Sequence, residues 1–98
     1  MSKPQLVIIP VEGRIDMKVF AGKDLEGGCP KFELMRQLAE LPPDTTLEML
    51  RLRYQGGPAY MFMDEDGLMN RRPINERATL LANRMIVGPV VVWTGKLE

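Results

Sequence analysis

Histidine is missing from this chain of 98 residues. Its absence excludes Ser-His and Cys-His nucleophilic schemes, acid–base catalysis by an imidazole, and metal sites with histidine ligands. A glycine-rich phosphate loop is missing too, because the Gly-Gly pairs at 27–28 and 56–57 lack a following lysine and a strand-to-helix context. We therefore expect a protein that is not an enzyme and that binds no cofactor and no metal.

Cysteine occurs once, as Cys29. A single thiol cannot form an internal disulfide, so nothing indicates an oxidising compartment, and cysteine-rich zinc sites are excluded. A position at a helix start would lower the pKa of this thiol. Without a neighbouring base or a second cysteine to complete a reactive pair, we interpret Cys29 as a structural residue.

Charge of one sign is not in excess, because 13 lysines and arginines balance 13 aspartates and glutamates. A general nucleic-acid binder needs a basic surface that displaces counterions, so we expect no general nucleic-acid binding. The balance also removes a strong field that would steer a charged partner. It leaves self-repulsion low, which is compatible with a homodimer.

No long apolar run occurs near the N-terminus. The run that does occur there, Leu6-Val7-Ile8-Ile9, is short. Four residues are too few for the core of a signal peptide or for a membrane span. We therefore expect a cytoplasmic protein that does not insert into a membrane. Apolar residues make up 45% of the chain and charged residues 27%, which is typical of one globular domain over residues 1–98.

The first half of the chain predicts a hairpin followed by a helix. Residues 6–11 are rich in β-branched side chains, and apolar residues at 15, 17 and 19 alternate with polar ones, which indicates two strands with the second half-buried. An apolar stripe at Leu34, Met35, Leu38 and Leu41 predicts a helix that begins at Pro30 and stops before Pro42-Pro43.

The second half predicts two more strands, a helix and a last strand. Residues 44–54 are ambiguous: Thr45 and Glu48 have the spacing of a helical capping box, but alternation from residue 50 to 54 favours a strand paired with residues 59–63. Asn75 is a candidate N-cap for a helix over residues 76–83. The apolar residues 90–93 predict a strand covered on both faces, or covered on one face with a partner on the other.

The order β-β-α-β-β-α-β predicts a single small α+β domain. We expect a mixed, mostly antiparallel sheet with two helices packed on it.

The run Asp64-Glu65-Asp66-Gly67 predicts a turn, because Asp and Gly tolerate the left-handed backbone region. A calcium loop is excluded, because Phe62 and Pro73 stand where ligands would be needed.

Two groups of arginines are candidate binding residues. Arg71, Arg72 and Arg77 lie near the helix start at Asn75, an arrangement that would suit an anion or a partner protein. The alternative, which we favour, is that these arginines are solvated or pair with the carboxylates at 64–66. Arg51 and Arg53 project from one side of a predicted strand; they form a solvated sheet face or, less often, a charged partner surface.

Four apolar residues are candidates for an interface. Met61 and Met63 are expected on one sheet face, and methionine is common on adaptable binding surfaces as well as in cores. Val91 and Trp93 lie on the last strand, which would be exposed if it formed the sheet edge.

Three segments of the C-terminal half carry a resemblance to a known family: Met63-Asp64-Glu65-Asp66-Gly67-Leu68, Pro73-Ile74-Asn75-Glu76-Arg77-Ala78-Thr79 and Ile86-Val87-Gly88-Pro89-Val90-Val91-Val92. Their order is similar to that in the domain-of-unknown-function 3846 family, small proteins of phages, plasmids and bacterial genomes. The resemblance covers about residues 60–95. It implies a mobile-element context and transfers no activity and no catalytic residue.

These observations lead to one expected function with two alternatives. We expect a non-enzymatic binding protein of a phage or mobile element that occupies or inhibits a host protein in the host cytoplasm. The first alternative is a protein that sequesters a small anionic nucleotide signal through Arg71, Arg72 and Asn75. The second is a structural homo-oligomeric subunit that pairs through its last strand.

Overall fold

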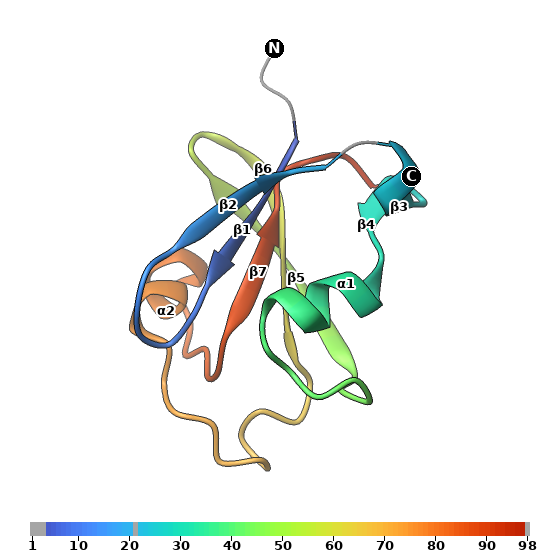
Figure 1. Cartoon of the computed structure of the whole chain (residues 1–98). Helices are drawn as coiled ribbons and strands as arrows, with labels where there is room; N and C mark the ends of the chain where they lie inside the picture. Colours follow the sequence, from blue (N-terminus) through green and yellow to red (C-terminus); the bar gives the residue numbers. More distant parts are fainter. Residues whose placement is uncertain (1–3, 21, 98) are drawn as a thin grey trace.

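A five-stranded sheet forms the centre of the domain (Figure 1). The computed structural model describes residues 4–20 and 22–97. The strands of this sheet are β1 (Gln5–Ile9), β2 (Asp16–Val19), β5 (Leu47–Tyr54), β6 (Gly57–Asp64) and β7 (Val90–Trp93). They lie in the order β2-β1-β7-β6-β5, and every neighbouring pair is antiparallel. The predicted α+β class is confirmed.

The last strand, β7, lies in the middle of the sheet between β1 and β6. Its four residues are at most 1% exposed, which explains the unbroken apolar run, because neither face of the strand meets water. Val91 and Trp93 face one side of the sheet, and Val90 and Val92 face the other. The predicted alternative of a strand covered on both faces is therefore the right one.

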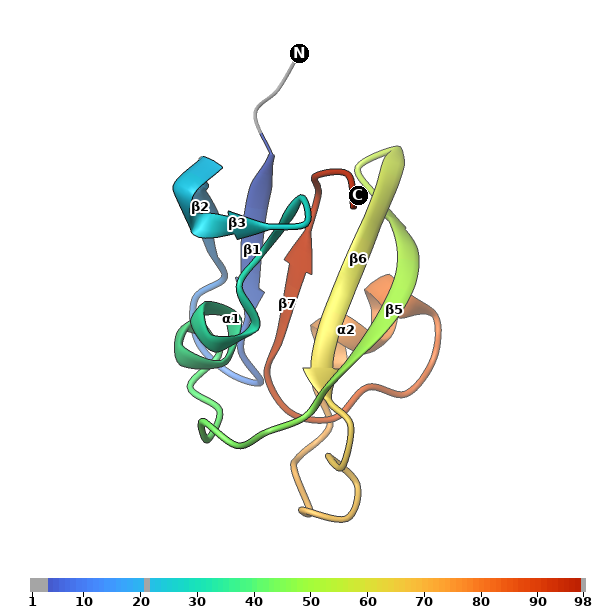
Figure 2. The same cartoon turned by 90° about the vertical axis from the view of Figure 1, so that its right-hand side faces the viewer.

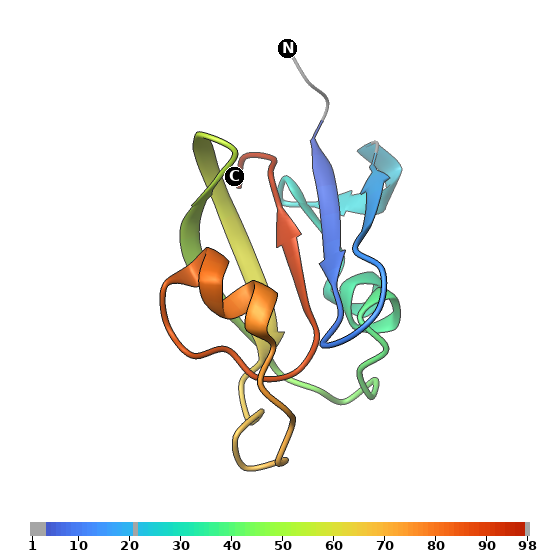
Figure 3. The same cartoon turned by 90° about the vertical axis from the view of Figure 1, so that its left-hand side faces the viewer.

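Two helices cover opposite faces of the sheet. Helix α1 (Phe32–Leu38) places Met35 in a core with Leu6, Phe62 and Trp93, whereas α2 (Glu76–Ala82) places Ala78 in the core on the other side. Figure 2 shows α1 on the β1 side of its face, with no helix over β5 and β6. Figure 3 shows α2 in front of β5 and β6 on the opposite face, with β1 and β2 beside it.

Helix α1 is shorter than its sequence pattern predicts. Pro30 is not its first residue but belongs to β4 (Cys29–Pro30), which pairs with β3 (Leu25–Glu26) after a short 3-10 helix at Gly22–Asp24. At its other end the helix stops at Leu38, ahead of the two prolines. Glu40 adopts a left-handed φ of 59°, and the amide of Leu41 donates to the carbonyl of Arg36. This is a Schellman motif formed without glycine.

Residues 47–54 of the ambiguous segment form strand β5, so the helical capping-box alternative at Thr45 and Glu48 is wrong. Strands β5 and β6 pair over eight consecutive residues in an unbroken register. The two residues that join them, Gln55 and Gly56, both have positive φ, as a type I′ turn requires. The predicted hairpin is confirmed, with Gly57 and Pro58 inside the second strand.

Strand β2 is exposed over its whole length, which corrects the expectation of a half-buried strand. Met17 pairs with Val7 and therefore faces the α2 side of the sheet. Helix α2 covers the β5–β6 half of that face and leaves β2 uncovered (Figure 3). Met17 and Val19 are each 56% exposed as a result.

Candidate functional site

Asp64 and Arg72 form an internal ion pair. Arg72 Nε lies 2.6 Å from Asp64 Oδ2, which also accepts a hydrogen bond from Asn70 Nδ2 at 3.0 Å. Oδ1 accepts from the Asp66 amide at 2.9 Å, so the predicted acidic turn is built around a carboxylate that is only 6% exposed. Burial by itself raises the pKa of Asp64, but the hydrogen bonds from Arg72, Asn70 and the Asp66 amide, with the Arg72 charge, outweigh it and lower this pKa.

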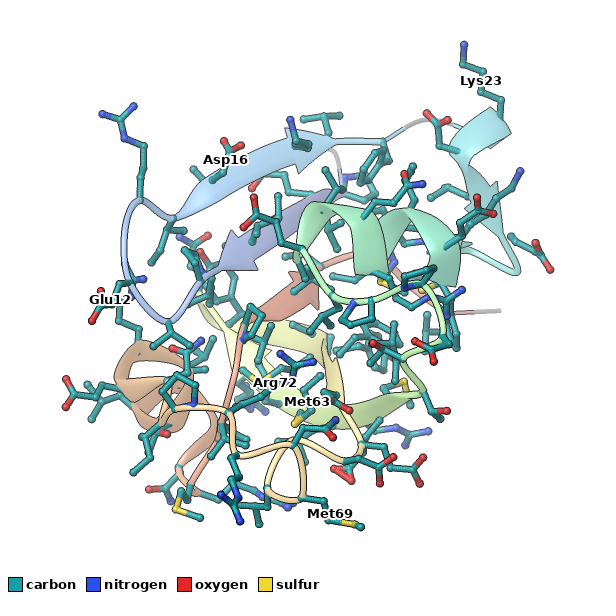
Figure 4. The ribbon with its side chains drawn as sticks, turned by 60° about the horizontal axis from the view of Figure 1, so that its bottom comes forward. Glu12, Asp16, Lys23, Met63, Met69 and Arg72 are labelled. Atoms are coloured by element: carbon teal, nitrogen blue, oxygen red, sulfur yellow. The ribbon has the colours of Figure 1, made fainter. Side chains whose placement is uncertain are left out.

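The loop from 65 to 73 thus has one arginine, Arg72, directed inward and one, Arg71, that is exposed. Figure 4 shows Arg72 lying inward at this end of the molecule, while Met69 projects at the rim. The pairing of an arginine with the 64–66 carboxylates, the favoured alternative in the sequence, is confirmed for Arg72. Arg71 is exposed at a left-handed φ of 55°.

Asn75 is a structural residue and is unavailable to an anion. It is fully buried, and its side-chain oxygen accepts from the Ala78 amide, which confirms the predicted N-cap of α2. Its Nδ2 donates to the carbonyls of Ile9 and Gly88, each at 2.9 Å. These three bonds join β1, α2 and the loop that precedes β7, so the prediction of Asn75 as a ligand residue is wrong.

The guanidinium of Arg77 also forms hydrogen bonds within the fold. Its Nη1 donates to the carbonyl of Gly13 at 2.7 Å, and Nη2 donates to the carbonyl of Pro10 at 2.5 Å. This guanidinium therefore clamps the β1–β2 turn onto α2. With Arg72, Asn75 and Arg77 engaged in internal bonds, only Arg71 of the predicted anion site is left on the surface, and the site is not assembled.

The four predicted interface residues lie in the core. Met61, Val91 and Trp93 are at most 1% exposed, and Met63 is 6% exposed. Met61 and Met63 do share a sheet face, as predicted, but α2 covers that face. Trp93 donates its indole N–H to the carbonyl of Gly28 at 3.0 Å and packs at 6.4 Å from the Phe20 ring. These side chains are unavailable to a partner of the folded domain.

Besides Arg71, the predicted site residues that the structure leaves accessible are Arg51 and Arg53. Both are exposed on β5, and their side chains share a sheet face with Met49 on the same strand and with Tyr60 on β6. Within residues 4–20 and 22–97 the ion pairs are Lys18–Asp16 and Arg72–Asp64, so neither arginine is paired there.

An apolar group that the sequence did not indicate completes this surface. Phe32 begins α1 and is 49% exposed, with its ring 5.6 Å from that of Phe62. Phe62 pairs with Met49, which is 41% exposed. We define the open sheet face by five residues: Phe32, Met49, Arg51, Arg53 and Tyr60. Its β5 and β6 residues lie where Figure 2 shows no helix above the sheet, and Phe32 adds a side chain from the start of α1.

Other parts of the described structure gather no comparable chemistry. A pocket of about 380 Å³ is lined by Asp44, Asp64, Asp66 and Arg72, but the Asp64 carboxylate is already bound to the arginine. No group of three or more potential ligand residues among those described is arranged to hold a metal ion. Burial raises the pKa of the Cys29 thiol to about 11, so the thiol stays protonated at neutral pH.

No family model, no curated protein and no solved structure matches this chain. The resemblance of residues 60–95 to the domain-of-unknown-function 3846 family therefore stays a prediction. Among the residues that the structure describes, no helix combines the length and the apolar character needed to cross a membrane.

Proposed function

We propose that this chain is a non-enzymatic protein-binding domain whose open sheet face docks an acidic surface of a partner protein. One observation carries the proposal: half of one sheet face has no helix over it and presents apolar side chains beside two arginines. Met49 on that half is 41% exposed, and Phe32, at the start of the neighbouring helix α1, is 49% exposed. Arg51 and Arg53 lie on the same face.

The composition of this face is that of a protein interface. Aromatic residues, methionine and arginine are enriched in the centres of such interfaces, and each of these types occurs here. Alternation along β5 places its acidic residue, Glu48, on the opposite face. An acidic partner surface would therefore meet two cations and no like charge from this strand, which favours association with that partner over others.

The two alternative ligands have less support. A nucleotide signal would need several converging cations, and of the three residues predicted to bind it, Arg71, Arg72 and Asn75, only Arg71 has its side chain outside internal hydrogen bonds. A nucleic acid would need a broad basic surface, and the chain has no net charge. An origin in a phage or mobile element, a host protein as the partner and action in the host cytoplasm are parts of the proposal that rest on the family resemblance.

The test is affinity capture from a bacterial lysate with matched variants, followed by calorimetry on the purified partner. Met49→Asp adds a charge within the open sheet face, and Leu80→Asp adds the same charge on α2, where Leu80 is 83% exposed. We expect Leu80→Asp to bind like the unmodified chain and Met49→Asp to bind at least about tenfold more weakly. Equal loss in both variants, or in neither, would remove the proposal.

A homo-oligomeric subunit is a second candidate, favoured by the exposed edge strand β2. Pairing through β7 is excluded, because this strand is already flanked by β1 and β6. β2 instead presents Met17 and Val19 at 56% exposure each, beside an edge that has no strand partner among the described residues. Light scattering over a range of concentrations decides this case, because a strict monomer rules it out.

A further inference from the structure

Strand β5 ends the sheet opposite β2, so one side of its backbone has no strand partner among the described residues. It is eight residues long and pairs with β6 in an unbroken register. Long, regular edge strands are the surfaces to which proteins add an extended segment of another chain.

The turn at the end of β5 determines which backbone groups point to this open edge. In a two-residue turn the carbonyl of the first flanking residue accepts from the amide of the last, so Tyr54 and Gly57 form a hydrogen-bonded pair. Hydrogen-bonded pairs alternate along an antiparallel ladder. The amides and carbonyls of Arg53, Arg51 and Met49 therefore point away from β6, toward the open edge.

The same two arginines supply the charge. Their side chains project from the open sheet face, two residues apart, while their backbone groups point to the edge. A segment added along β5 would place alternate side chains directly across from Arg51 and Arg53. Acidic residues at positions i and i+2 of that segment would match both cations.

A second copy of this chain is a poor occupant of the edge. Two β5 strands paired with each other would bring their arginines onto one face, and like charges across a ladder are destabilising. The charge of the edge therefore favours a different chain with acidic side chains.

We propose that β5 binds an extended acidic segment of the partner by strand addition, with Asp or Glu at alternate positions opposite Arg51 and Arg53. This inference rests on the proposed protein-binding function and specifies how the partner is held. Main-chain hydrogen bonds supply attachment, and the spacing of the acidic residues supplies selectivity.

The experiment uses synthetic peptides and the full chain, with binding followed by fluorescence anisotropy. The probe is a ten-residue peptide of alternating glutamate and valine, and a block peptide, Glu-Glu-Val-Val-Glu-Glu-Val-Val-Glu-Val, keeps its charge but places no two glutamates two positions apart. A third peptide carries N-methyl groups on alternate amides, which blocks backbone pairing without altering the side chains. Amide exchange of Met49, Arg51 and Arg53 is followed in parallel.

Charge reversal gives the matched control on the protein. Arg51→Glu/Arg53→Glu should no longer bind the alternating glutamate–valine peptide and should bind an alternating lysine–valine peptide instead. Arg14→Glu/Lys23→Glu makes the same change in net charge at two other exposed residues and should bind like the unmodified chain.

We expect the alternating peptide to bind at least about tenfold more tightly than the block and N-methylated peptides, and to slow exchange at the outward amides. Equal binding of all three peptides, or no binding of any, overturns strand addition. Neither result touches the wider proposal, which depends on whether Met49→Asp and Leu80→Asp differ with the captured partner.

Discussion

At the scale of single residues, most of the polar side chains singled out in the sequence hold the fold together. Asn75 and Arg77 bond to groups 66 and 67 residues away in the chain, and Arg72 bonds to Asp64, eight residues before it. Arginine and asparagine suit this work because each offers several donors in a fixed geometry. A run of such residues therefore indicates a charge-rich segment without indicating whether its charges are available to a ligand.

Replacing Asp64 with asparagine should destabilise the domain by about 3 kcal/mol, because Arg72 would then be left without its charged partner. Urea denaturation measures the loss. Asp66→Asn is the control, since Asp66 is exposed, and it should cost less than about 0.5 kcal/mol. Similar losses in both variants would contradict a special role for the Asp64–Arg72 pair.

The same ion pair should make the stability of the domain depend on pH in the acid range. Because the pKa of Asp64 is lowered on folding, its contribution is present above the pKa of the unfolded chain and is lost as pH falls through the folded value. The unmodified chain should lose more stability below about pH 4 than Asp64→Asn does. Urea midpoints of the two proteins at pH 7 and pH 3 give the comparison, and parallel pH curves would contradict it.

Cys29 predicts that stability also falls at high pH, the opposite direction from the effect of Asp64. Burial raises the pKa of its thiol from 9.0 to about 11, so stability is full below pH 9 and declines as pH rises toward 11. We expect a loss of about 2 kcal/mol that Cys29→Ala does not show. The two proteins are compared by urea denaturation at pH 8 and pH 11; an equal loss in both would assign the decline to other groups.

At the scale of elements, short sequence motifs predicted hairpins and a helix cap correctly, whereas the start of a helix was harder to predict. The hairpin β1–β2, the N-cap at Asn75 and the β5–β6 hairpin could be predicted, because a few adjacent residues determine each of them. The start of α1 could not, since Pro30 is equally compatible with the first turn of a helix and with the short strand that it forms.

The end of α1 offers a test of backbone strain. Glu40 has a left-handed φ of 59°, which is unfavourable for a residue with a Cβ and ordinary for glycine. Glu40→Gly should therefore stabilise the domain by about 0.5 kcal/mol, after the greater freedom of glycine in the unfolded chain is subtracted. Glu33→Gly, inside the same helix, should instead cost about 1 kcal/mol. Urea midpoints that move in the same direction for both variants would contradict this account.

At the scale of the whole molecule, the arrangement of the strands decided what the sequence pattern left open. Val91 and Trp93 are core residues because β7 is central, and Met17 is exposed because β2 is at the edge. Both facts depend on pairings between distant segments, which periodicity within one segment does not record. Arg51 and Arg53 could be predicted on an outer face, because alternation within one strand is enough for that. The exposure of Phe32 could not be predicted, because it depends on where α1 packs on the sheet.

Helix α1 leaves β5 and β6 uncovered on one face of the sheet, and α2 leaves β2 uncovered on the other face. Together with a pI of about 6.3 and no net charge, this predicts a solubility minimum near pH 6.3. Val19→Lys, on the uncovered β2 edge, should raise solubility there more than Leu80→Lys does, although both add one charge. Precipitation by polyethylene glycol measures the difference; equal gains would assign the effect to net charge alone.

The pairing of β1 with β7 has a consequence for biosynthesis. Leu6 lies opposite Trp93, and Val7 lies opposite Val92, so β1 leaves the ribosome well before β7, the strand that lies on its inner side in the sheet. Until residues 90–93 emerge, the β1–β2 hairpin and the β5–β6 hairpin have no strand between them. Assembly of the sheet is therefore a late event, after translation of nearly the whole domain, and the nascent chain exposes Leu6, Val7 and Ile8 to chaperones until then.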